Sequence, residues 1–568
     1  MSEQPNGPPP EANPHFPLDA IDPADLEITW ERDDMHMPYA LTPLASDYVE
    51  HTIGASFNYH HQRFGGPQTL LGRVWHGYAY FGFSWNVPTE QEDATKERWT
   101  QALRDRIPAT AAYWRDDAMP ELERLYASIS SVPVDDLAAP ELASAWQNAW
   151  AATLRAWQIH FVTIMGPYQV LEDLADQYNA ALGPGRDVEA LSLVRGQVHE
   201  LEDVEARIDA LAAMLAQSPE LARAVAAQAA QAEMHDEEMP LDREAFDRVP
   251  GGPAFVAALV AFLEAHGHLG QNHDDLGAAS WVEAPAMLFT SLARRIAGAG
   301  GAGGGGGARE ASGGPDARLA ELRRVAADRA EAVRAALADK PDELARFETT
   351  LGHALDIGHL TESHNYWIDR MAQARLRTLA TRIGRRLVRD GVLDRAGDIL
   401  FLRRDDVCDA VVDGQPRQEL VRDRRAALER QRTVTPPRYV GPIPEDTGPP
   451  DRFDSVRIES TEANVLRGTG ASAGVVRGPA RVVESQDAFG LVQPGEIIVC
   501  PASNPSWVPI FTIAGGLVTN TGGVLSHAAV VAREFGLPAV VGVVGATGKI
   551  ADGRMVEIDG TAGTVRLL

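Results

Sequence analysis

The residues with the clearest chemical potential are His527 and the serine before it, which follow a glycine pair, Gly522 and Gly523. The first turn of a helix carries unpaired backbone N–H groups, and the helix dipole favours negative charge there. Glycines allow an anion to approach the backbone closely, and neutral imidazole is a good nucleophile near pH 7. A histidine at such a helix start is suited to carry a phosphoryl group. A lone histidine near a helix end, in contrast, usually has a structural role.

The flanking sequence supplies the elements that such a site needs. The apolar run 515–519 predicts a strand that leads into the glycine pair. The run 528–535 predicts a helix that begins directly after His527 and ends at Gly536. A second apolar run, 539–541, predicts another strand. Strand, glycine turn and helix start together predict an anion-binding site.

The complete string 519–542, TNTGGVLSHAAVVAREFGLPAVVG, resembles the phosphohistidine motif of the phosphoenolpyruvate-utilising mobile (swivelling) domain. That domain occurs in phosphoenolpyruvate synthase, pyruvate phosphate dikinase and rifampin phosphotransferase. The resemblance implies that His527 carries the phosphoryl group. We expect backbone N–H groups around the glycine pair to hold its oxygens, with side-chain donors beside them. The predicted phosphate-binding residues are Thr521, Gly522, Gly523, Ser526 and Arg533.

Composition narrows the class of protein. The formal net charge of −28 argues against binding to nucleic acid or to anionic membranes, because both need basic patches. Two cysteines are too few for a disulfide framework and suit a reducing compartment. Neither a membrane-spanning apolar run nor a signal peptide is recognisable. We therefore expect a soluble, cytoplasmic protein.

A histidine-rich segment, 262–281, lies in the part of the chain that we predict to be helical. His and Asp side chains can bind divalent ions, but the spacing matches no closed zinc pattern, so no metal site is predicted. The segment resembles the Y-G-H-R-G-x-x-E-x-D-L region of the family's substrate-binding domain, with Leu269 at the position of the arginine. We expect His268 to be a candidate catalytic base, and His273 and Asp274 to contact the acceptor.

The segment 360–370, LTESHNYWIDR, mixes charge into an aromatic helix. His364 and Ile368, four apart, would share one face, with Glu362 and Asp369 near two different edges. A histidine beside a glutamate can act as general base, whereas the alternative is a polar contact between helices. The run resembles T-E-D-H-N-F-x-I-D in stand-alone family members, including the histidine-bearing subunit of phenylphosphate synthase. We expect His364 to be the base, and Glu362 and Asn365 to bind substrate.

Composition and periodicity divide the chain into a disordered tail (1–24), a large, mainly helical part (25–432), a proline-rich linker (433–462) and a C-terminal part with short strands (463–568). The resemblance implies that the helical part is the acceptor-binding domain and that the last part is the swivelling phosphohistidine domain, with the family's β/β/α arrangement. We therefore expect a multidomain α plus α/β fold. Within the helical part, 297–315 is a flexible glycine-rich loop, and 57–88 is an aromatic stretch whose spacing suits strands or an aromatic-lined cavity.

Residues 90–430 have helical periodicity and no recognisable ATP-grasp pattern. The chain therefore resembles rifampin phosphotransferase without its ATP-grasp domain, or the His subunit of phenylphosphate synthase. The resemblance implies that a separate ATP-grasp protein with ATP and Mg²⁺ loads His527, with ATP ending as AMP and phosphate, and that the phosphoryl group then passes to a small-molecule hydroxyl. We expect no cofactor bound by this chain itself. Two alternatives stay open: a non-catalytic phosphohistidine regulator or binding module, and a subunit of an ATP-dependent condensing ligase.

Overall fold

The computed structural model describes residues 16–18, 21–34, 36–196, 200–234, 241–269, 276–285, 288–289, 292, 315–443, 464–484, 486–503, 507–511, 513–524 and 526–568. The chain forms two compact units. The first comprises 1–96, 132–154 and 378–447, and the second comprises 97–131, 155–377 and 448–568. The predicted loop 297–315 lies almost entirely outside the described residues, as do most of the predicted tail and residues 444–462 of the predicted linker. The predicted domain boundaries remain predictions.

The first unit contains a four-stranded antiparallel sheet in the order β2-β3-β1-β4 (β1 Trp30–Arg32, β2 Gln68–Trp75, β3 Tyr78–Trp85, β4 Tyr439–Val440). A two-residue turn with positive φ at both positions joins β2 to β3, as the strand twist of a hairpin requires. Strands were one expectation for the aromatic stretch 57–88, and 68–85 confirm it. Its first part is different, because Phe57 lies in helix α2 (Gly54–Phe64).

Helices complete the first unit: α1 Pro43–Tyr48, α17 Arg404–Asp413, α18 Gln418–Arg432 and the first part of α5 (Ala139–Leu182). The buried carboxylate of Asp47 accepts hydrogen bonds from the Arg403 side chain at 2.6 Å and from the backbone N–H of Arg404 at 2.7 Å. The indole N–H of Trp146 donates to the Arg404 carbonyl at 3.0 Å. These contacts fix the start of α17 against α1 and α5.

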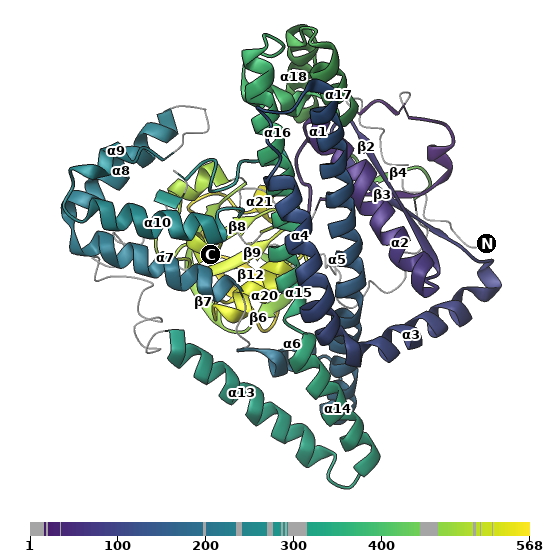
Figure 1. Ribbon diagram of the computed structural model, residues 1–568. Coiled ribbons are helices and arrows are strands. Elements are labelled where there is room, and N and C mark those ends of the chain that lie inside the picture. The colour runs from purple at the N-terminus through teal and green to yellow at the C-terminus, as the bar shows by residue number, and fades with distance from the viewer. Residues whose placement is uncertain are drawn as a thin grey trace. The chain divides into compact units, whose positions relative to one another are not determined.

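The second unit begins with a large helical part, which bears out the periodicity of the sequence (Figure 1). Its longer helices are most of α3 (Glu92–Tyr113), α4 Met119–Ser130, the second part of α5, α7 Glu200–Gln217, α8 Pro219–Met234, α10 Gly252–His266, α13 Pro315–Ala336 and α14 Pro341–Ile357. Helix α16 (Met371–Arg389) begins in the second unit, and its residues from 378 onward belong to the first. One apolar core lies among α5, α13 and α14, and another among α7, α8 and α10. Helix α15 (Leu360–His364) and the π-helical turn η7 (Asn365–Arg370) lead into α16.

The second unit ends with an eight-stranded mixed sheet in the order β5-β12-β11-β7-β8-β9-β10-β6. Its strands are β5 Val465–Arg467, β6 Thr469–Ser472, β7 Val475–Val482, β8 Ile497–Cys500, β9 Gly516–Thr519, β10 Ala539–Val541, β11 Met555–Asp559 and β12 Thr564–Leu567. Strands β7 to β10 pair in parallel, and helix α20 (His527–Glu534) connects β9 to β10. The expected fold class, a large helical part followed by a C-terminal α/β part, is confirmed. Within the described ranges, no helix is both long and apolar enough to span a bilayer.

Candidate functional site

The start of α20 has the geometry that the sequence predicts. Ser526 is the N-cap, and its hydroxyl accepts a hydrogen bond from the backbone N–H of Ala529 at 3.4 Å. His527 is the first helical residue. Gly522 has a φ of 107°, and a Cβ at that position would lie 2.8 Å from the hydroxyl oxygen of Ser526. Glycine is therefore required there both for the backbone conformation and for the space beside the cap.

The imidazole of His527 is held by a carboxylate from the helical part of the same unit. Its Nδ1 lies 2.7 Å from Oε2 of Glu362 on α15, and both side chains are buried. A carboxylate accepts hydrogen bonds, so Nδ1 carries the proton and the lone pair resides on Nε2. The nitrogen suited to take a phosphoryl group is consequently Nε2. We expected Glu362 to bind substrate, whereas in the structure its carboxylate contacts the ring of His527.

An apolar contact accompanies this hydrogen bond. Val524, three residues before His527, is 4% exposed and belongs to the same core cluster as Leu171, Leu360 and Ile357. Burying a valine side chain stabilises an arrangement by about 1.5–3 kcal/mol. A further contact comes from Arg195, which donates to the backbone carbonyl of Arg533. The α/β part is therefore docked on the helical part with its histidine facing inward.

Two of the predicted phosphate-binding side chains have other partners in this arrangement. The hydroxyl of Thr521 donates to the carbonyl of Pro501 at 3.1 Å. The buried guanidinium of Arg533 donates to the carbonyl of Ala471 at 3.1 Å. Burial, with the neighbouring Arg195, lowers the pKa of Arg533 to about 9. Both residues support the fold around His527, and their role toward a phosphoryl group remains a prediction.

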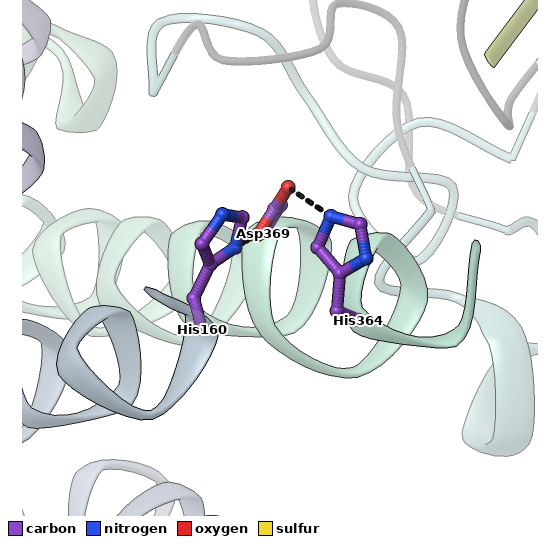
Figure 2. A group of neighbouring side chains, drawn as sticks. All are labelled: His160, His364 and Asp369. Atoms are coloured by element: carbon purple, nitrogen blue, oxygen red, sulfur yellow. Dashed lines mark hydrogen bonds and ion pairs between the residues drawn. The ribbon is translucent and has the colours of Figure 1, made fainter. Parts of the chain in front are cut away.

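His364 belongs to a buried cluster that the sequence did not suggest. Figure 2 shows Asp369 between the rings of His160, from α5, and His364. Asp369 Oδ1 lies 2.7 Å from Nδ1 of His160, and its Oδ2 lies 3.9 Å from Nε2 of His364. Nδ1 of His364 lies 2.7 Å from the carbonyl oxygen of Leu360 and donates to it. Desolvation is the main cause that lowers the pKa of His364 to about 4, so the ring is neutral at pH 7.

The π-helical turn brings His364 and Asp369 together. Residues five apart on an α-helix are separated by about 140° around its axis, which would put His364 and Asp369 on different faces. A π-helical turn closes i→i+5 hydrogen bonds, so residues five apart come close to alignment. Because η7 begins directly after His364, Asp369 lies beside it. Asn365 bonds locally, with its amide 3.4 Å from the carbonyl oxygen of Thr361.

The cluster and the Glu362–His527 pair are electrostatic neighbours. Burial is the main cause that raises the pKa of Tyr168 above its ordinary range, and the charges of Glu362 and Asp369 raise it further. Glu362 also acts on His364. The phenol of Tyr168, on α5, is therefore neutral at pH 7 and lies within electrostatic reach of both groups. No local signal in the sequence pointed to His160 or Tyr168, because both occur in a regular helix far from the other residues in the chain.

His268 occupies a different environment. It follows α10, and its ring lies edge-on to the ring of Tyr366 at a centroid distance of 4.5 Å. Burial, followed by the charges of Arg375, His266 and Arg370, holds its pKa well below the ordinary value. None of these neighbours is His527 or Glu362. The two other residues predicted from this segment, His273 and Asp274, lie outside the described residues.

Comparison with protein families agrees with this architecture. Residues 492–563 match the model described as PEP-utilising enzyme, mobile domain, and residues 160–355 match the rifampicin phosphotransferase fourth domain. The resemblance expected from the sequence is confirmed. The first match contains the glycine pair, His527 and α20, and the second contains His160, whereas η7 follows its end.

Three curated relatives illustrate the similarity. Chondramide synthase cmdD of Chondromyces crocatus is 29% identical over 578 residues, which is 98% of this chain and 14% of that protein. The uncharacterized phosphotransferase YvkC of Bacillus subtilis is 30% identical over 40% of this chain and 28% of its own length. A rifampicin phosphotransferase of Streptomyces sviceus is 38% identical over 32% of this chain and 20% of its own length. The chain thus spans between about a seventh and just over a quarter of these relatives.

Proposed function

We propose that this chain is the phosphohistidine-carrying and acceptor-binding part of a phosphotransferase. The observation that carries the proposal is the hydrogen bond between Nδ1 of His527 and Glu362 at the start of α20. It leaves Nε2 as the nucleophilic nitrogen of a histidine that faces the helical part. The names of the relatives rifampicin phosphotransferase and phosphotransferase YvkC support the same reaction class.

Glu362 has a specific use in the transfer step. When the phosphoryl group is on Nε2, a proton on Nδ1 makes the ring a neutral imidazole as it leaves, instead of an imidazolate. A carboxylate 2.7 Å from Nδ1 stabilises that proton. The P–N bond then breaks with its electron pair returning to Nε2, and a P–O bond forms to the acceptor oxygen. Phosphoryl transfer depends mainly on such positioning and charge stabilisation.

The acceptor is a small molecule with a hydroxyl group, and its proton passes to a base of the helical part. His364 is the candidate that lies in the electrostatic neighbourhood of Glu362. His268 is the second candidate. A pKa of about 4 leaves His364 neutral and able to accept a proton at pH 7, although a base with a pKa nearer 7 would be more efficient.

Loading is proposed to occur elsewhere. A separate ATP-grasp protein with ATP and Mg²⁺ would phosphorylate Nε2 of His527, with ATP ending as AMP and phosphate. For this step the α/β part would turn about the segment 433–462 and withdraw from Glu362, as expected for a swivelling domain. Such a chain would be inactive without its nucleotide-binding partner. A cytoplasmic location fits this use of ATP.

The test uses ATP labelled separately at the β and γ positions, with and without the candidate ATP-grasp protein. We expect acid-labile, base-stable label on the wild-type chain only when that protein is present, and no label on the His527→Ala variant. A His527→Ala chain that still phosphorylated an acceptor would refute the scheme. Absence of label under every condition would favour a regulator or binding module.

A second candidate is a subunit of a condensing ligase that activates a substrate oxygen as its phosphate. Chondramide synthase cmdD, whose match covers 98% of this chain, is named a synthase. That name supports the condensing-ligase function rather than the kinase function. The product separates the two. A kinase releases a phosphorylated acceptor, whereas a ligase releases a condensed molecule and inorganic phosphate.

A further inference from the structure

The cluster of His160, His364 and Asp369 has the spacing of a metal-ligand set. One ligand atom from each residue can be chosen so that all three lie within 4.8 Å of one another. Ligand atoms around a tetrahedral ion with bonds of about 2.0–2.1 Å lie roughly 3.3 Å apart. The two contacts to the Asp369 carboxylate, 2.7 Å from Oδ1 to His160 and 3.9 Å from Oδ2 to His364, lie on either side of that value. Side-chain adjustments would bring all three ligand atoms around one ion.

The hydrogen bond of His364 is also typical of a metal ligand. Its Nδ1–H donates to the Leu360 carbonyl, which directs the lone pair of Nε2 toward Asp369. Metal-binding histidines ordinarily donate their other ring N–H to a carbonyl or carboxylate in this way.

We propose that His160, His364 and Asp369 bind a divalent transition-metal ion of the Zn²⁺ class. Two imidazoles and one carboxylate suit such an ion, whereas Mg²⁺ and Ca²⁺ prefer oxygen ligands. Three protein ligands leave at least one coordination position for an exogenous oxygen. The π-helical turn is the structural device that makes the set, because it aligns His364 with Asp369. Such turns are frequently found at functional sites.

Metal binding itself does not depend on the proposed function, but the use of the metal does. Tyr168 lies within electrostatic reach of both Glu362 and Asp369, so the ion would bind in the neighbourhood of His527. A hydroxyl coordinated to a divalent ion loses its proton more readily than a free one. With the ion in place, His364 would coordinate it instead of abstracting a proton. The acceptor hydroxyl would bind the ion as an alkoxide, its proton having passed to water, and the alkoxide oxygen would form the P–O bond. The acceptor would then be a molecule whose hydroxyl can reach the coordination position that the three protein ligands leave open.

The test is a Co²⁺ titration of the full chain after chelator treatment, with Zn²⁺ competition to give the affinity. We expect one Co²⁺ per chain, with visible absorption bands typical of low-symmetry nitrogen and oxygen coordination. Asp369→Asn and His160→Gln should each weaken Zn²⁺ binding by more than about tenfold, since even the loss of a residue behind a ligand costs that much. Far-ultraviolet circular dichroism checks that both variants are folded.

His353→Ala is the matched control, because this histidine lies on α14 and outside the cluster. It should bind metal as the wild type does. Absence of Co²⁺ bands in the wild type would overturn the proposal, and so would equal affinity in the wild type and the Asp369→Asn chain. If the ion binds at this cluster while no phosphoryl transfer is found, the site stands and only its use in transfer fails.

Discussion

Two buried histidines of the second unit, His527 and His364, show how a partner on one ring nitrogen decides what the other can do. Both use Nδ1 as the donor: His527 to the carboxylate of Glu362, and His364 to the carbonyl of Leu360. A carboxylate stabilises a positive charge that builds up on the ring, so it suits a histidine that gains and loses a phosphoryl group. A carbonyl fixes the tautomer with less charge stabilisation, which suits a neutral ligand or hydrogen-bond acceptor.

The largest expected effect separates the two histidines directly. His527→Gln should abolish phosphoryl labelling, because it removes the nucleophile. His364→Gln should keep full labelling and lower transfer to the acceptor by about 10²-fold, the ordinary range for loss of acid–base or metal assistance. Labelling by the ATP-grasp protein and release of label to the acceptor are measured separately. Loss of labelling in His364→Gln would mean that the two histidines do not divide the reaction as proposed.

Glu362 provides a second test of how the partner of His527 affects phosphoryl transfer. Glu362→Gln removes the charge beside Nδ1 of His527 and should slow the transfer of label to the acceptor by about 10²-fold. The loading rate should stay within about twofold of the wild type, because the histidine is away from Glu362 when it is loaded. Rapid-quench assays of each half-reaction measure both rates. Equal slowing of the two would show that Glu362 acts on the fold of the α/β part.

Gly522 tests how tightly the start of α20 is built. Gly522→Ala forces a side chain into a positive-φ conformation and against the Ser526 hydroxyl, 2.8 Å away, so the unfolding free energy should fall by about 1–3 kcal/mol. Gly183 is the matched control, since its φ is 105° but nothing lies within 4 Å of an added Cβ. Urea unfolding of both variants measures the difference. An equal loss in the two would mean that the contact with Ser526 is unimportant.

A third buried histidine, His268, predicts a dependence of stability on pH. Its pKa in the folded protein is well below the ordinary value near 6.5, so between these two values the unfolded chain binds a proton that the folded chain does not. Stability from this residue is therefore complete above pH 6.5 and falls as the pH decreases, by up to about 1.4 kcal/mol per pH unit. His268→Leu should reduce the slope of unfolding free energy between pH 6.5 and 5.5. An unchanged slope would contradict the burial of a neutral ring.

The carrier part of the site could be predicted in detail because its residues are close together in the chain. The glycine pair, the N-cap Ser526, His527 and the flanking strands β9 and β10 lie within 519–542, and short-range rules place each of them. The structure agrees to within one residue at most of these boundaries. Here the local sequence determines the local geometry.

The helical part of the site could not be predicted in this way. His160 and Asp369 are 209 residues apart, and only the packing of α5 against η7 brings them together. A single residue in a regular helix gives no signal of such a contact. The π-helical turn was also missed, because the faces of 360–370 were assigned with the α-helical period. Glu362, which we expected to bind substrate, contacts His527 across 165 residues of sequence, and no local pattern indicates that contact.

The π-helical turn makes this segment tolerant of one particular change in chain length. A π-helical turn is equivalent to one extra residue inserted into an α-helix, so deletion of Asn365 would allow continuous α-helix from α15 into α16. Asp369 would then be the fourth residue after His364, and residues four apart share one face of an α-helix. The deletion would therefore keep Asp369 beside His364 and keep the apolar residues of α16 in the core. A one-residue deletion within α16, in contrast, would rotate every later residue of that helix by about 100°.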